Sequence, residues 1–168
     1  FVGAPQYDNG EQNEGRVYVF LGFGDGGQTL RLFWSEEGNQ TKAKFGASVG
    51  TAGDVNNDGY DDVIIGAPQY DNDEIDEGAA FVFYAGTSGL TITSHTLLDS
   101  DQSEAEFGTS VGTAGDVNGD GYADVIVGAP VYSNTAGLKV GAAFAFYGSA
   151  SGLSITPTWM FEGWRADT

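Results

Sequence analysis

Two nine-residue stretches of this chain, Asp54–Asp62 and Asp116–Asp124, repeat one pattern of oxygen-bearing side chains. Each has Asp or Asn at its first, third, fifth and ninth positions and glycine at its sixth. Side chains at this spacing converge in a tight turn, and converging oxygen atoms bind hard cations. The carboxylates of such a turn repel one another unless a cation offsets their charge. We call these stretches the metal loops and predict a cation site in each.

Ca²⁺ is the cation that the metal loops favour. The backbone carbonyl at position 7 would add to the side chains at positions 1, 3, 5 and 9, and such a flexible oxygen set suits Ca²⁺ better than the smaller Mg²⁺. Soft metals are disfavoured, because the chain has no cysteine and no histidine near either loop. The predicted ligands of the two Ca²⁺ sites are Asp54, Asn56, Asp58, Tyr60 and Asp62 in the first, and Asp116, Asn118, Asp120, Tyr122 and Asp124 in the second.

Known loops of other kinds share part of the metal-loop pattern. The helix–loop–helix calcium site and the dockerin type both require an acidic residue at position 12, where Ile65 and Val127 stand. An ordinary Asn/Asp/Gly hairpin turn that binds no ion is the remaining alternative, and the match of two copies argues against it. Position 8 is not an expected ligand, because Asp61 of the first loop corresponds to Ala123 of the second.

The composition narrows the classes of partner. The chain has 168 residues, with 24 Asp and Glu against six Lys and Arg, and its formal net charge is −18. Such a protein is repelled by the phosphates of nucleic acids and by anionic lipid surfaces. No apolar run approaches the roughly 20 residues of a membrane-spanning helix. We therefore expect neither nucleic-acid binding nor membrane insertion, and a fold that is stable without disulfides.

The chain also repeats itself over a period of 62 residues, the distance from Asp54 to Asp116. The segment 45–54 recurs as 107–116, and the segment 62–70 recurs as 124–132. A period of this length is typical of repeat architectures. The predicted units are a partial repeat over 1–44, which lacks a first strand and a metal loop, and full repeats over 45–106 and 107–168.

Each unit is predicted to be a small β-sheet. Its apolar runs are short, rich in Val, Ile, Phe, Tyr and Thr, and bounded by Gly, Asn, Asp and Pro, with no helical spacing. Four short antiparallel strands per repeat indicate the blades of a β-propeller. An up-and-down path places the metal loops at one end of the sheets and the long turns 69–77 and 131–140 at the other. The strands expected in the second unit are 46–53, 61–67, 79–85 and 91–98.

Two paired motifs make the chain similar to a known repeat. Phe45-Gly46 is followed by Gly66-Ala67-Pro68, and Phe107-Gly108 by Gly128-Ala129-Pro130. The chain thus resembles the FG-GAP repeat, the blade unit of integrin alpha-subunit propellers. The resemblance implies four-stranded blades in a ring, usually of seven, with Ca²⁺ in the loop that joins the first two strands. About 2.7 repeats (168 residues over a period of 62) form only an incomplete ring, so further blades are expected in the same chain or in neighbouring chains.

The resemblance also implies a function. It indicates a secreted or cell-surface protein that serves adhesion or protein–protein interaction, with a protein or glycan ligand on the face opposite the calcium loops. The chain has no nucleophile elbow, cysteine or histidine cluster, so we do not expect an enzyme. A structural subunit of an extracellular fibre or coat, and an accessory propeller of a larger hydrolase, remain as alternatives. The acidic turn 71–77 is expected to be solvated, and His95 to serve packing or the surface.

Overall fold

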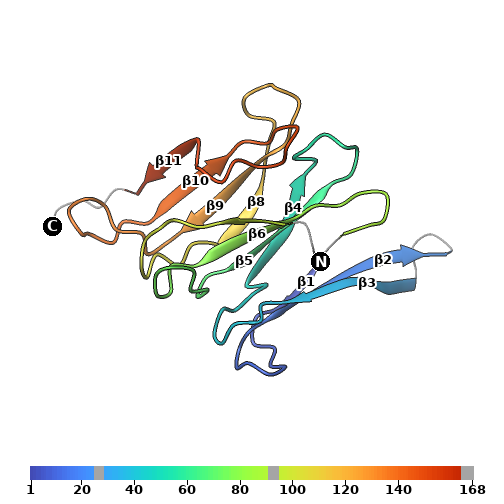
Figure 1. Cartoon of the computed structure of the whole chain (residues 1–168), viewed down its shortest axis with the longest axis horizontal. Helices are drawn as coiled ribbons and strands as arrows, with labels where there is room; N and C mark the ends of the chain where they lie inside the picture. Colours follow the sequence, from blue (N-terminus) through green and yellow to red (C-terminus); the bar gives the residue numbers. More distant parts are fainter. Residues whose placement is uncertain (25–28, 91–94, 164–168) are drawn as a thin grey trace.

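The computed structural model describes residues 1–24, 29–90 and 95–163, and its regular elements in these ranges are eleven β-strands (Figure 1). The strands form three antiparallel sheets, which we call blades 1, 2 and 3. Blade 1 contains β1 (Val2–Ala4), β2 (Arg16–Phe23) and β3 (Thr29–Glu37). Blade 2 contains β4 (Ser48–Gly53), β5 (Asp62–Ala67), β6 (Ala79–Phe83) and β7 (His95–Leu98). Blade 3 contains β8 (Ser110–Gly115), β9 (Asp124–Ala129), β10 (Ala142–Phe146) and β11 (Trp159–Glu162).

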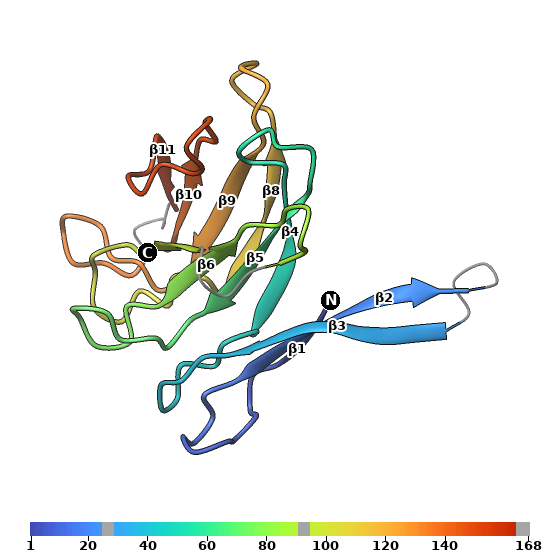
Figure 2. The ribbon, with the colours of Figure 1, turned by 45° about the vertical axis from the view of Figure 1, so that its right-hand side comes forward.

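The prediction of an all-β fold built from propeller blades is confirmed. Consecutive strands are neighbours within each blade, and the first strands of blades 2 and 3, β4 and β8, lie side by side (Figures 1 and 2). Three strand bounds differ from the prediction. β4 begins at Ser48, after the left-handed Gly46, β5 begins at Asp62, and β6 ends at Phe83. Residues 91–94 of the fourth predicted strand lie outside the described residues. The bounds of the repeats stay a prediction.

The core consists of two apolar layers, one between each pair of neighbouring blades. Alternate residues of β5 point to opposite faces, so one strand serves both layers. Ile65 packs with Val17 and Phe81 between blades 1 and 2, whereas Ile64 packs with Val127 and others between blades 2 and 3. All six residues of β5 are buried. Removal of this apolar surface from water is the main stabilising contribution to the fold.

Glycines set the distance between the blades. A Cβ atom on Gly66 would lie 1.9 Å from the carbonyl oxygen of Gly108, and one on Gly3 would lie 2.0 Å from that of Gly46. Such distances are far shorter than any van der Waals contact, so these positions admit no side chain. Each Phe-Gly pair thus docks on the Gly-Ala-Pro segment of the preceding blade. The two motifs of one repeat therefore serve different interfaces.

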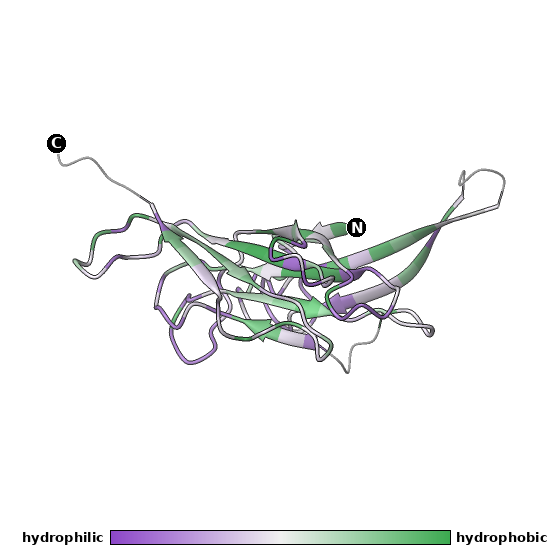
Figure 3. Cartoon of the chain, turned by 90° about the horizontal axis from the view of Figure 1, so that it is seen from above, coloured by the Kyte–Doolittle hydropathy of each residue, from purple (hydrophilic) through white to green (hydrophobic). Residues whose placement is uncertain are grey.

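The two end blades leave apolar surface exposed. On the outer face of blade 1, Leu30 and Leu32 are 67% and 53% exposed, and hydrophobic colour follows the projecting β2–β3 hairpin in Figure 3. On the outer face of blade 3, Ile126 is 40% exposed, whereas Ile64, its counterpart in blade 2, is fully buried. In the described part of the chain, no helix is long and apolar enough to cross a membrane.

The interblade contact yields a prediction with a matched control. We expect Gly66→Ala to lower the free energy of unfolding by about 2 kcal/mol or more, because the new methyl group would overlap backbone of blade 3. The control is Gly128→Ala, since a Cβ on Gly128 meets the rotatable Ser110 hydroxyl instead. Urea denaturation would measure both variants. Equal losses in the two variants would contradict the proposed role of the Gly66 contact.

Candidate metal centre

The first metal loop is folded by two residues with left-handed backbone. Its residues 54–61 lie between β4 and β5, its last residue Asp62 begins β5, and Asn57 and Gly59 have φ values of 56° and 91°. Gly119 and Gly121 take the same positions in the second loop, with φ values of 76° and 90°. Glycine and asparagine adopt this conformation most readily. From the sequence we predicted only the bend at position 6. The occurrence of Asn57 in the first loop and Gly119 in the second was a signal that position 4 is left-handed as well.

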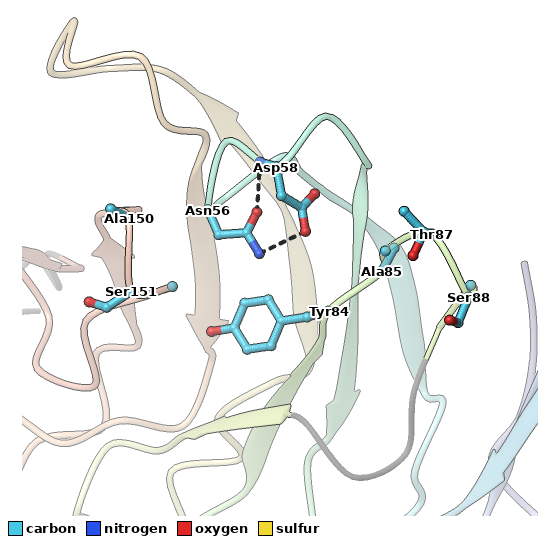
Figure 4. A pocket seen from close by; sticks show the side chains of 11 residues that line it. Asn56, Asp58, Tyr84, Ala85, Thr87, Ser88, Ala150 and Ser151 are labelled. Carbon is cyan, nitrogen blue, oxygen red and sulfur yellow. Dashed lines mark hydrogen bonds between the residues drawn. The ribbon is translucent and has the colours of Figure 1, made fainter.

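Side chains at positions 1, 3 and 5 hold the loop in shape. Asp54 accepts hydrogen bonds from the backbone N–H groups of Asp58 (3.0 Å) and Gly59 (2.8 Å). Asn56 Oδ1 accepts from Asp58 N–H at 3.0 Å, and Asn56 Nδ2 donates to Asp58 Oδ2 at 3.3 Å (Figure 4). These oxygens turn toward the loop's interior, and each carboxylate oxygen has a second lone pair left for a cation.

The second loop repeats this arrangement. Asp116 accepts hydrogen bonds from the N–H groups of Asp120 (3.0 Å) and Gly121 (2.9 Å), and Asn118 Oδ1 accepts from Asp120 N–H at 2.9 Å. Asn118 Nδ2 donates to Asp120 Oδ2 at 2.9 Å. The two loops therefore share these internal hydrogen bonds, although their sequences differ at positions 4 and 8.

The aspartates at position 9 are fully buried and serve as structural acceptors. Asp62 Oδ2 accepts from Val55 N–H at 3.1 Å, and its Oδ1 accepts from Ala85 N–H at 2.8 Å. Asp124 makes the equivalent bonds with the N–H groups of Val117 (2.9 Å) and Gly148 (3.0 Å). Each aspartate thus joins its metal loop to the segment after the third strand of its blade. Participation of Asp62 and Asp124 in a cation site stays a prediction.

The electrostatics of the first loop suit a cation. Burial raises the pKa of Asp62 to about 6; the N–H groups of Ala85 and Val55 oppose this shift, and the Asp58 and Asp54 carboxylates add to it. The ion pairs seen in the described residues, of Arg16 with Glu37 and of Lys139 with Glu104, lie elsewhere. A hard dication would offset this charge, and an all-oxygen donor set fits Ca²⁺.

The two metal loops are linked directly. The N–H group of Ala123 donates to the carbonyl oxygen of Asp54 at 3.0 Å, and the N–H group of Ser149 donates to that of Val55 at 3.1 Å. The Cβ atom of Ala123 lies only 2.7 Å from the place where Gly53 would carry a Cβ. This crowding accounts for glycine at position 53, where a side chain would overlap the second loop.

A polar pocket of about 490 Å³ lies beside the first metal loop, between blades 2 and 3 (Figure 4). Asn56 and Asp58 line one side, and Tyr84 with the turns 85–89 and 150–152 forms the rest. The Tyr84 hydroxyl accepts a hydrogen bond from the N–H group of Leu153 at 3.2 Å, which ties the two blades together. The first loop is therefore open to solvent and to ions on the side of this pocket.

Another acidic group lies at the opposite end of blade 2. One carboxylate oxygen each of Glu77, Asp99 and Asp101 lies within 4.8 Å of the other two. The structure describes every acidic side chain of the two metal loops, and no three of them come this close together. Glu77 is 1% exposed, its Oε1 accepts from the N–H groups of Asn72 (2.7 Å) and Asp73 (2.9 Å), and burial raises its pKa. The expectation of a wholly solvated turn is therefore wrong for Glu77.

Glu14 has the same role in blade 1, because it is 1% exposed and accepts from the N–H group of Asn9 at 2.6 Å. We did not predict this role, although the sequence contains a signal for it: Tyr-Asp-Asn, four variable residues and Glu-Gly occur at both 7–15 and 70–78. These glutamates fold the turns on the face opposite the metal loops.

Comparison with known proteins agrees with the fold and the motifs. The family model of the FG-GAP repeat matches residues 45–83 and 107–147. The chain carries FG-GAP repeats. It is 32% identical to integrin alpha-3 of Cricetulus griseus over 163 residues, which are 96% of this chain and 14% of that protein. It is 34% identical to human integrin alpha-6 over 127 residues, and 38% identical to integrin alpha-PS5 of Drosophila melanogaster over 148 residues.

These two matches cover 76% and 87% of this chain, and 11% and 14% of the respective integrins. The FG-GAP segment thus spans about one seventh of the length of the curated relatives that it matches. The interpretation of the sequence as an integrin-like propeller segment is confirmed at this level.

A variant of the buried Asp62 can test its structural role separately from a role in cation binding. We expect Asp62→Ala to lower the free energy of unfolding by about 2–4 kcal/mol even with a chelator present, because it leaves the buried N–H groups of Val55 and Ala85 unpaired. The control Asp61→Ala reproduces position 8 of the second loop and should change this energy by less than about 0.5 kcal/mol. Denaturation in EDTA would measure both. A loss in Asp62→Ala that appears only with Ca²⁺ would rule out the structural role.

Proposed function

We propose that this FG-GAP segment is part of a calcium-binding β-propeller of a secreted or cell-surface protein that serves adhesion or protein–protein interaction. The observation that carries the proposal is the pair of metal loops with one internal geometry, each rich in carboxylates. The resemblance of most of the chain to integrin alpha subunits supports the adhesive role. We propose no catalytic role.

In this proposal, each loop holds one Ca²⁺ through its side chains at positions 1, 3, 5 and 9 and the carbonyl at position 7. The ion supplies positive charge among carboxylates that otherwise repel one another. Asp62 and Asp124 hold the loops in place through their backbone hydrogen bonds. Calcium sites of extracellular modules have dissociation constants of about 10⁻⁴–10⁻³ M, which suits saturation outside the cell.

The partner would bind on the face opposite the metal loops. The buried Glu14 and Glu77 shape the turns of blades 1 and 2 there from within. Apolar side chains are exposed on this face in blades 2 and 3: Ile75 is 69% and Leu138 46% exposed. Isolated apolar groups on a rigid, polar rim are suited to recognition of a protein surface. The exposed outer faces of blades 1 and 3 would be covered by further FG-GAP blades.

Removal of calcium tests the proposal. We expect 10 mM Ca²⁺ to raise the melting temperature by on the order of 10 °C over that in EDTA, since two sites near 100-fold saturation each stabilise by about 2.7 kcal/mol. The double variant Asp58→Ala with Asp120→Ala should lose most of this shift. Differential scanning calorimetry with and without Ca²⁺ would measure it.

The acidic group at the other end of blade 2 provides the control. Asp99→Ala with Asp101→Ala removes two carboxylates of that group and leaves both metal loops intact. We expect this double variant to keep the full calcium-dependent shift in melting temperature. Loss of the shift in this variant, or its persistence in Asp58→Ala with Asp120→Ala, would refute the assignment of Ca²⁺ to the metal loops.

A further inference from the structure

A small cavity lies between blades 1 and 2, away from the metal loops. Its volume is about 150 Å³, roughly that of five water molecules. Glu36, near the end of β3, and Tyr70, just after β5, are among its lining residues. Tyr70, which follows β5, and Glu37 with Gly38, which end and follow β3, lie on the side of the long turns.

Aromatic rings form most of the wall. The rings of Phe45, Tyr70, Phe81, Phe83 and His95 line the cavity. Neighbouring rings stand steeply to one another: Phe45 and Phe83 at 87°, Tyr70 and Phe81 at 86°, and Phe45 and Phe81 at 68°. These rings pack edge to face against one another and border the cavity from several directions. The face of an aromatic ring attracts a cation.

Glu36 places a carboxylate in this aromatic surrounding. Its side chain is half-buried and takes part in neither of the ion pairs found in the described residues. The neighbouring Glu37 is engaged by Arg16 at 2.9 Å and by Asn9 Nδ2 at 2.9 Å. Burial and the charge of Glu37 raise the pKa of Glu36, while His95 opposes this. Glu36 thus places a carboxylate at the cavity that belongs to neither of these ion pairs, and the charges of His95 and Arg16 act on it without pairing with it.

The interface between blades 2 and 3 has leucine at the position that Glu36 occupies between blades 1 and 2. Glu36 lies opposite Val17 in blade 1, and Leu98 lies opposite Ala80 at the corresponding place in blade 2. Leu98 is 1% exposed and belongs to the apolar core between blades 2 and 3. That interface has the same steep aromatic rings, with Phe107 and Phe146 at 89°. The first interface thus keeps the edge-to-face aromatic rings and has a carboxylate where the second has leucine.

We propose that the cavity between blades 1 and 2 binds an alkylated ammonium group, with Glu36 as its counter-ion and the aromatic rings as its walls. The cavity is smaller than the roughly 300–1,000 Å³ of sites for drug-sized ligands, which fits a single ammonium head group. The net charge of −18 favours a cation. The group belongs either to a free small molecule or to a lysine-derived side chain of a protein partner. The site is independent of the metal loops.

Titration of the full chain with choline, followed by ligand-observed NMR, tests the proposal. We expect saturable binding of choline and none of its neutral isostere 3,3-dimethyl-1-butanol. Glu36→Gln should weaken binding at least tenfold, because it removes the charge and keeps the shape. Glu36→Leu copies Leu98, so it should abolish binding and raise the melting temperature. Glu74→Gln, an exposed control with the same charge change, should bind choline as the parent does.

A second arm distinguishes the two sources of the ammonium group. A short peptide that contains trimethyllysine would be titrated in parallel with choline. Tighter binding of the peptide indicates a protein side chain, and equal or weaker binding indicates a small molecule. Equal binding of the neutral isostere, or unchanged choline binding in Glu36→Gln, would overturn the proposal, as would the absence of choline and peptide binding to the parent chain.

Discussion

The packing of the chain depends on the close approach of backbone to backbone between neighbouring blades. The carbonyl oxygens of Gly46 and Gly108 occupy the space that a Cβ atom would need on Gly3 and Gly66. This approach brings the apolar faces of the sheets together, so that β5 is buried on both sides. It requires glycine just before the first strand of a full repeat and glycine in its second strand, which explains why both motifs recur at one period.

The same spacing determines the polar chemistry at the ends of the blades. At one end it brings the metal loops together, where Ala123 N–H reaches the Asp54 carbonyl oxygen at 3.0 Å. Each loop is further anchored by a buried aspartate whose two oxygens accept backbone N–H groups. Carboxylates thus act in two ways: the fully buried ones at position 9 fix the loops, and those at positions 1 and 5, which are half-buried or exposed, remain accessible to a cation. At the other end the spacing leaves the aromatic cavity beside Glu36.

Sequence reasoning predicted what is periodic. The repeat, the strands and the pattern of the metal loops follow from spacing along the chain, and the structure has β4–β7 within a few residues of the predicted strands wherever it describes them. The sequence did not predict the burial of Glu77 or the position of Glu36 at the cavity, because a charged residue is expected in solvent unless its partners are known. Those partners are N–H groups of a turn and side chains of another blade, and only the folded arrangement of the chain shows them.

Isothermal titration calorimetry of the chain with Ca²⁺ tests the central claim most directly, because it counts the ions that bind to each chain. We expect two Ca²⁺ ions per chain, and one ion per chain after Asp58→Ala alone, which removes a ligand from the first loop only. Binding of fewer than two ions to the parent chain, or of two ions to the variant, would contradict the claim.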